Sequence, residues 1–183
     1  MSKRSSSIGR SIGIGVGAVA ALAIAIQLVP YGHDHTNPPI TQQVNWDSQQ
    51  TRDLFYRACA DCHSNETKWP WYSNVAPVSW LVMRDVQEGR QHFNISAPVE
   101  RRGFGEGPGG PPPGGEGQGG EGFRRRDHSP AGMVESGDMP MPIYLTMHPE
   151  ARLTDAEKQQ LIDGLKATFG KGGGIDTAIA SVP

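Results

Sequence analysis

The chain has 183 residues with 17 basic and 19 acidic side chains, so its formal net charge is −2 at pH 7. A nucleic-acid partner would normally need a basic face, and this near-neutral balance gives no reason to expect one. The two cysteines, Cys59 and Cys62, lie in one short motif, which excludes a disulfide framework and a four-cysteine zinc site. An apolar N-terminal segment and a Gly/Pro-rich middle leave about 100 residues, enough for one small domain.

The N-terminus combines a basic leader with an apolar run. The first ten residues contain three basic side chains and no acidic one, and the uncharged run Ile12–Val29 follows. Its length lies between a signal-peptide core and a spanning helix, so cleavage after Ala25 is an alternative. Because the apolar run continues past Ala25, we expect an uncleaved anchor over 1–29 whose apolar part contacts the lipid bilayer. The positive-inside rule then predicts a single-pass protein of the bacterial inner membrane with its domain in the periplasm.

Small residues recur at every fourth position of this segment. In a helix they form one smooth stripe, which is typical of spanning helices that pack closely together. The pattern therefore allows self-association of the anchor, although a generic Gly/Ala-rich helix is the alternative. The stripe consists of Gly9, Gly13, Gly17, Ala21 and Ala25.

A polar linker is predicted over 30–44, before a domain at 45–170 and a flexible tail at 171–183. His33 and His35 lie in the linker and could hold a metal ion, but we expect both to be solvated.

Helical periodicity predicts a first helix that begins near Asp47 or Ser48 and carries its apolar stripe straight into the two cysteines. A loop is expected over 65–77. Ser79 is then expected to cap a second helix that ends near His92.

The second half of the domain begins with a biased stretch. Gly103–Gly122 contains eleven Gly and four Pro in twenty residues, so it is predicted to be a disordered insert. An ordered loop is expected over 136–149. The last helix is predicted from the capping-box pair Thr154 and Glu157, with Gly170 as its stop. No segment has a convincing strand pattern, and the fold class is therefore all-α.

The chemistry is concentrated in Cys59-Ala60-Asp61-Cys62-His63, a C-x-x-C-H motif. Two thiols one helical turn apart can each add to one vinyl group of the same porphyrin, and His63 can then ligate the iron. A thioredoxin-like pair would require a βαβ setting that the pattern lacks. We therefore predict one haem c, attached covalently through Cys59 and Cys62.

The segment around this motif, 57–81, reads RACADCHSNETKWPWYSNVAPVSWL and resembles the signature of the small bacterial haem-binding domain family. Residues 136–140 and 144–151 resemble the second block of that family. The resemblance spans about 45–165, apart from the insert, and implies a cytochrome c-like helical domain around one haem, with an N-terminal membrane anchor.

In cytochrome c-like domains a methionine in the loop before the last helix supplies the sixth iron ligand, often followed by proline. Met139 fits this position, because Pro140 follows it. His148 is the alternative, which would give bis-histidine ligation and a lower potential. Met141, Met147 and an iron without a second protein ligand also remain open.

Further residues are expected to hold the haem. By resemblance to cytochrome c, the carbonyl of Pro77 is the predicted acceptor for the second ring nitrogen of His63. Four aromatic side chains are expected to line the ring, although ordinary core packing would explain them too. They are Trp69, Trp71, Tyr72 and Trp80.

One-electron transfer to redox partner proteins at the membrane is the function that these features favour, since two protein ligands leave no iron position for a substrate. An electron carrier is therefore expected rather than an enzyme. The alternative is a haem enzyme or sensor, peroxidase-like or gas-binding, with an open or labile sixth position.

Overall fold

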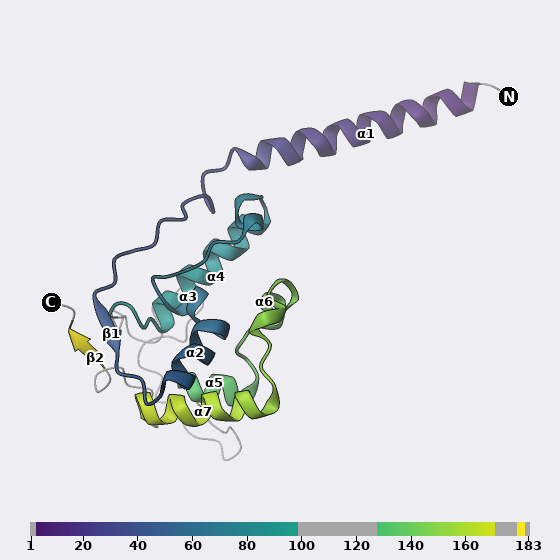
Figure 1. The fold of residues 1–183 in the computed structure, drawn as a ribbon. Helices are drawn as coiled ribbons and strands as arrows, with labels where there is room; N and C mark the ends of the chain where they lie inside the picture. Colours follow the sequence, from purple (N-terminus) through teal and green to yellow (C-terminus); the bar gives the residue numbers. More distant parts are fainter. Residues whose placement is uncertain (1–2, 99–127, 171–178, 182–183) are drawn as a thin grey trace, which may run out of the picture. The chain divides into compact units, whose positions relative to one another are not determined.

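The computed structural model describes residues 3–98, 128–170 and 179–181 (Figure 1). These residues are mostly helical, which confirms the all-α prediction. The predicted insert at 103–122 and most of the predicted tail lie outside them. The chain divides into two units, of which the first is Met1–Thr36 with Lys68–Asp85 and the second is Asn37–Thr67 with Val86–Pro183.

The first unit begins with the long helix α1, Lys3–Gln27. Its 18-residue window Arg10–Gln27 is long and apolar enough to cross a membrane, and none of this window is buried within the protein. The helix continues past Ala25, as the anchor prediction required, and ends two residues before the apolar run does. Pro30 follows shortly afterwards and cannot continue a helix.

The chain after α1 is mostly exposed, but two of its residues are packed, which corrects the prediction that His35 is solvated. The ring of His35 stacks on Trp69 with centroids 4.5 Å apart, and its Nε2 lies 3.1 Å from the carbonyl oxygen of Ser73. Gly32 is buried at a φ of 88°, where a Cβ would approach the carbonyl carbon of Ser79 to 2.8 Å. Glycine is therefore required there for both conformation and space. His33 is exposed, as expected.

The remainder of the first unit contains the 3₁₀ helix η1, Trp71–Asn74, and the first half of α4, Val78–His92. The end of α4 at His92 agrees with the prediction, but its start does not. Ser79 already lies inside the helix, and its buried Oγ has no hydrogen-bond partner among the described residues. Ser79 is therefore not the cap.

The second unit is built on the crossing of α2, Gln49–Ala58, with α7, Asp155–Phe169 (Figure 1). Ser48 caps α2 by accepting from the Thr51 amide, as predicted. The predicted capping box of α7 is also present. The core between these helices is aromatic and aliphatic, and it includes Leu54, Phe55, Leu161, Leu165 and Phe169.

The segment 136–149, predicted to be a loop, is a loop only over 137–141 and is mostly helical after that. Helix α5 covers Pro130–Ser136, α6 covers Pro142–Met147, and the 3₁₀ helix η2 covers Pro149–Ala151. Each of these short helices has a proline in its first turn, a position that tolerates the missing N–H. Each of these three helices is too short to show the periodic apolar pattern that identifies a helix, so the sequence did not reveal them.

Two short strands also correct the prediction that the chain has none. In the second unit β1, Gln42–Val44, pairs antiparallel with β2, Ile179–Ser181. Gln43 lies opposite Ala180 in this pairing. Three residues are too few for the alternation that identifies a strand. The pairing also means that residues 179–181 are not part of a loose tail.

Candidate functional site

The haem motif lies at a break between two helices of the second unit. Helix α2 ends at Ala58, and α3 covers Ala60–His63, with Cys59 between them at a φ of −132°. The carbonyl oxygen of Cys59 accepts from the amides of Cys62 and His63 at 3.2 and 3.0 Å. The expectation of one helix through both cysteines is therefore wrong, but a tight turn still holds them together.

The two cysteines form no disulfide, and both side chains are partly buried. Burial raises the pKa of the Cys59 thiol to about 12, with a smaller contribution from Cys62. A redox-active pair needs one cysteine with a low pKa, so this environment does not favour thioredoxin-like chemistry.

The proton on His63 is positioned by two backbone carbonyls. Nδ1 lies 2.9 Å from the carbonyl oxygen of Phe93 and 3.1 Å from that of Gly89. Because carbonyl oxygens only accept, Nδ1 carries the proton and donates it, and Nε2 keeps its lone pair. Burial also lowers the pKa of His63, which favours the neutral ring. A neutral imidazole with its second nitrogen tied to a carbonyl is the form that ligates metals.

This geometry corrects the predicted role of Pro77. The Pro77 carbonyl oxygen accepts from the Trp80 amide in the first turn of α4, at 3.2 Å. The acceptors for His63 come instead from the C-terminal end of α4, where Gly89 begins the last turn and Phe93 follows it. Carbonyls in the last turn of a helix lack some of their intrahelical partners and are available to other donors.

Helix α4 can supply these carbonyls because it approaches the motif closely. A Cβ on Gly89 would lie 2.6 Å from the carbonyl oxygen and 2.9 Å from the Cβ of Cys62. Both atoms belong to the motif and have little freedom to move. Gly89 is therefore the one residue of this turn whose lack of a side chain permits the contact.

A buried polar network fixes the segment that follows α4. Asn94 donates from Nδ2 to Oδ1 of Asn65 at 2.9 Å, and Ser96 Oγ accepts from the Asn65 amide at 3.0 Å. The amide of Ile95 donates to the carbonyl oxygen of His63 at 2.9 Å. The residues directly after the motif are thereby tied to the residues that orient its histidine.

Arg90 braces the same region from α4. Its Nε donates to the carbonyl oxygen of Ser64 at 2.9 Å, and its Nη2 donates to Thr67 Oγ1 at 2.8 Å and Asn37 Oδ1 at 2.9 Å. Thr67 Oγ1 in turn donates to the carbonyl oxygen of Asp61 at 2.6 Å.

Tyr144 of α6 belongs to the second block of the family resemblance, and it contacts the C-x-x-C-H motif. Its hydroxyl donates to Asp61 Oδ2 at 2.8 Å, and its ring stacks on His148 with centroids 4.2 Å apart. Burial, followed by the negative charge of Asp61, raises the pKa of Tyr144. The segment that carries the candidate sixth ligands therefore contacts the residue between the two cysteines.

The candidate sixth ligands have different surroundings. Met139 is partly buried, and its amide donates to the Met133 carbonyl at 3.0 Å. Met141 is also partly buried, whereas Met147 is half exposed. His148 Nδ1 lies 2.9 Å from Glu150 Oε1. The assignment of the sixth ligand stays a prediction.

The aromatic residues predicted to line the ring belong to the first unit, and their role stays a prediction. Trp69 and Trp80 have buried indole N–H groups without an acceptor among the described residues. Tyr72 is partly buried, whereas Trp71 is 75% exposed.

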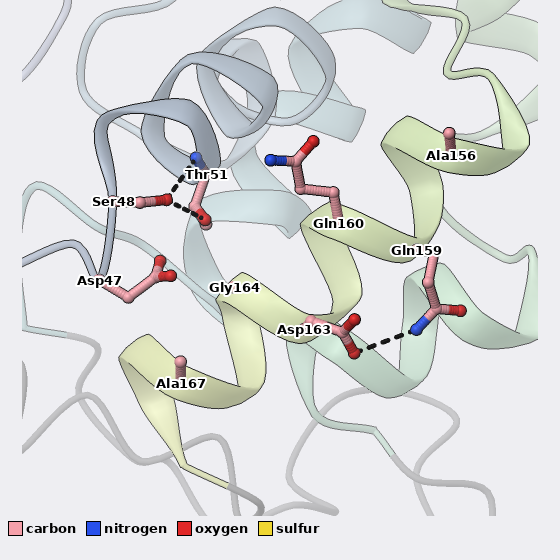
Figure 2. A pocket seen from close by; sticks show the side chains of 9 residues that line it. All are labelled: Asp47, Ser48, Thr51, Ala156, Gln159, Gln160, Asp163, Gly164 and Ala167. Atoms are coloured by element: carbon pink, nitrogen blue, oxygen red, sulfur yellow. Dashed lines mark hydrogen bonds between the residues drawn. The ribbon is translucent and has the colours of Figure 1, made fainter.

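A separate open depression lies between the start of α2 and α7, and Figure 2 shows its lining. None of its residues belongs to the haem motif, and its polar side chains are already bonded to one another in part, as in the pairs Ser48–Thr51 and Gln159–Asp163. Within the described part of the chain, no three His, Cys, Asp or Glu side chains gather in a way that could hold a metal ion.

Sequence reasoning missed four residues that build the site. Gly89 and Phe93 act through backbone carbonyls, which leave no side-chain signal in a sequence. Asp61 occupies a variable position of the motif, and Tyr144 was noted only as part of the second block. Their hydrogen bond joins residues 83 positions apart, and only the tertiary structure reveals it.

Comparison with known protein families identifies a family for this chain. Searches of curated proteins and of solved structures found no match. A family comparison matches residues 21–103 and 124–167, well over half of the chain, to a family described as a haem-binding domain. The gap between the two matched ranges coincides with the Gly/Pro-rich stretch. The resemblance first noted at 57–81 is thereby confirmed, and the chain belongs to the haem-binding domain family.

Proposed function

We propose that this haem protein is a monohaem c-type cytochrome that carries single electrons at the outer face of a bacterial cytoplasmic membrane. The observation that carries the proposal is the state of His63 beside the two thiols. Its Nδ1 is held by two carbonyls, so its Nε2 is the nitrogen available to iron. A bound haem supplies a reversible one-electron couple, and the protein supplies its ligands and its surroundings.

The cysteines support covalent attachment rather than binding by ligation alone. Cys59 and Cys62 are one turn apart, are not paired with each other, and flank the turn that ends at His63. Covalent bonds from both would prevent loss of the cofactor in a compartment where free haem is dilute. The apolar helix α1 would keep the carrier in the membrane, close to redox partner proteins.

Loss of the cysteines tests the attachment. Cys59→Ser or Cys62→Ser should leave at most one thioether bond, and the double variant should yield protein without covalent haem. Haem staining after denaturing electrophoresis measures this directly, with an Arg52→Ala variant as a control on the exposed side of α2. A wild-type band without stain would refute c-type attachment while leaving haem binding intact.

A further inference from the structure

The C-terminal end of α1 is bonded to the loop that precedes α4. Gln27 Nε2 donates to the Ala76 carbonyl at 3.0 Å, and the Ala76 amide donates to Gln27 Oε1 at 2.9 Å. The side-chain amide thus satisfies both backbone groups of one residue. Together with the contacts of Gly32 and His35 described above, it holds the chain from 27 to 36 against residues 69–79 of the same unit.

The residues next to Ala76 are apolar and exposed. Trp71 is 75% exposed, Val75 45%, Val78 43% and Leu81 40%, although Ala76 itself is buried. No charged residue occurs anywhere between Lys68 and Arg84. An uncharged segment with several exposed apolar side chains is suited to contact an apolar surface rather than water.

The length of the candidate span places this segment at the membrane boundary. An 18-residue helix is about 27 Å long, close to the roughly 30 Å hydrocarbon core of a bilayer. Gln27 then lies where the span leaves the lipid, and Ala76 is bonded to it directly. No intervening residues separate the exposed segment from the interface, and tryptophan is favoured at this depth.

We propose that Trp71, Val75, Val78 and Leu81 form a juxtamembrane surface that inserts into the head-group region of the same bilayer that α1 spans, so that Trp71 contacts lipid rather than the haem. The exposed side chains of Leu28, Val29 and Tyr31 extend it along the chain that leaves α1. The surface would fix the first unit against the membrane, with Gln27 as its tether. This inference rests on the membrane anchor of the proposed function.

Single cysteine probes in the full-length holoprotein test it. Val75→Cys and Val78→Cys are labelled with a nitroxide, and the protein is reconstituted into phosphatidylcholine–phosphatidylglycerol liposomes. Collision rates with oxygen, which partitions into lipid, and with a water-soluble nickel chelate report the location of each probe. Val19→Cys on α1 serves as the lipid reference and Gln49→Cys, at an exposed position at the start of α2, as the comparison. Unsubstituted protein measures any labelling of Cys59 or Cys62.

Probes at 75 and 78 should collide more with oxygen and less with nickel than the probe at 49. If they are as open to nickel as the probe at 49 while the probe at 19 remains in lipid, the juxtamembrane surface is refuted and the anchor stands. A probe at 19 that is open to nickel would refute the anchor itself. Shielding from both reagents at 75 and 78 would mean that protein covers the surface, and would also overturn the proposal.

The tether has its own test. Gln27→Leu keeps α1 apolar but removes both bonds to Ala76, so the probe at 75 should become more accessible to nickel while the probe at 19 is unchanged. An unaltered probe at 75 would show that Gln27 does not hold the surface in place.

Discussion

At the scale of single residues, two backbone oxygens determine the chemistry of His63. Because both acceptors lie on α4 and its C-terminal extension, the tautomer depends on how closely α4 approaches the motif. Gly89 permits that approach, since any Cβ there would meet backbone and Cβ atoms of Cys62. The proposed ligand histidine is therefore oriented by backbone carbonyls of Gly89 and Phe93, neither of which is a proposed iron ligand.

The prediction at the level of single residues concerns the sixth iron ligand. Met139→Ala should abolish the weak red charge-transfer band of a methionine-ligated ferric haem and lower the reduction potential, because a thioether ligand favours ferrous iron. His148→Ala should leave both unchanged. Absorption spectra and a redox titration of the purified protein measure the two effects.

Other outcomes would reassign the ligand. A normal Met139→Ala spectrum beside a high-spin His148→Ala protein would indicate bis-histidine ligation. If neither substitution changes the spectrum, Met141 and Met147 are the next candidates, and ready binding of carbon monoxide would favour the alternative of an enzyme or sensor.

At the scale of elements, the crossing of α2 and α7 depends on Gly164. A Cβ at this position would overlap the side chain of Thr51, which is buried and bonded to Ser48 (Figure 2). Thr51 is β-branched and short, so it has little room to turn away. The two helices can therefore pack at this distance only with glycine on α7.

Gly164→Ala should consequently destabilise the protein by about 1–3 kcal/mol, the usual cost of overpacking. Alanine favours helix over glycine by about 1 kcal/mol, so without the overlap the variant would be at least as stable as the wild type. A variant that is not destabilised would therefore mean that the crossing of α2 and α7 adjusts freely. Chemical denaturation followed by circular dichroism measures the change. The same substitution in a Thr51→Ala background should cost less, because two of the overlapping atoms are gone.

The N-terminus of α7 predicts a dependence of stability on pH. Glu157 accepts from the Thr154 amide and from Arg57, and these contacts lower its pKa from 4.5 to about 2. A carboxylate with a depressed pKa in the folded state stabilises it above the unfolded pKa and loses this contribution as the pH falls. The stability difference between wild type and Glu157→Gln should therefore shrink between about pH 4.5 and pH 2. A difference that is constant over this range would contradict the prediction.

At the scale of the whole molecule, the Gly/Pro-rich stretch is expected to be dispensable for haem binding. The family comparison leaves out residues 104–123. A segment of this Gly/Pro-rich composition has too little apolar surface to contribute to a core. Deletion of Gly105–Gly120 should leave the haem spectrum and the haem yield unchanged, because shortening a loop alters its closure entropy little. A collapse of the haem yield would show that the stretch has a structural role.

Several features were predictable because their signals are local. The C-x-x-C-H motif and its flanking residues led to the haem-binding domain family, and the apolar run predicted α1. Ser48 and the pair Thr154 and Glu157 marked helix starts, since a cap forms between residues three apart in the chain. Each of these inferences needed only a short window of sequence.

Tertiary structure alone decided the features that join distant segments. The carbonyls that orient His63, the bond from Tyr144 to Asp61 and the pairing of β1 with β2 connect residues far apart in the chain. Backbone groups are the same in every residue, so no sequence pattern could identify Phe93 rather than Pro77 as the acceptor. The sequence by itself determined which chemistry is present, and the packing of α4 and α6 around the motif decided which atoms support it.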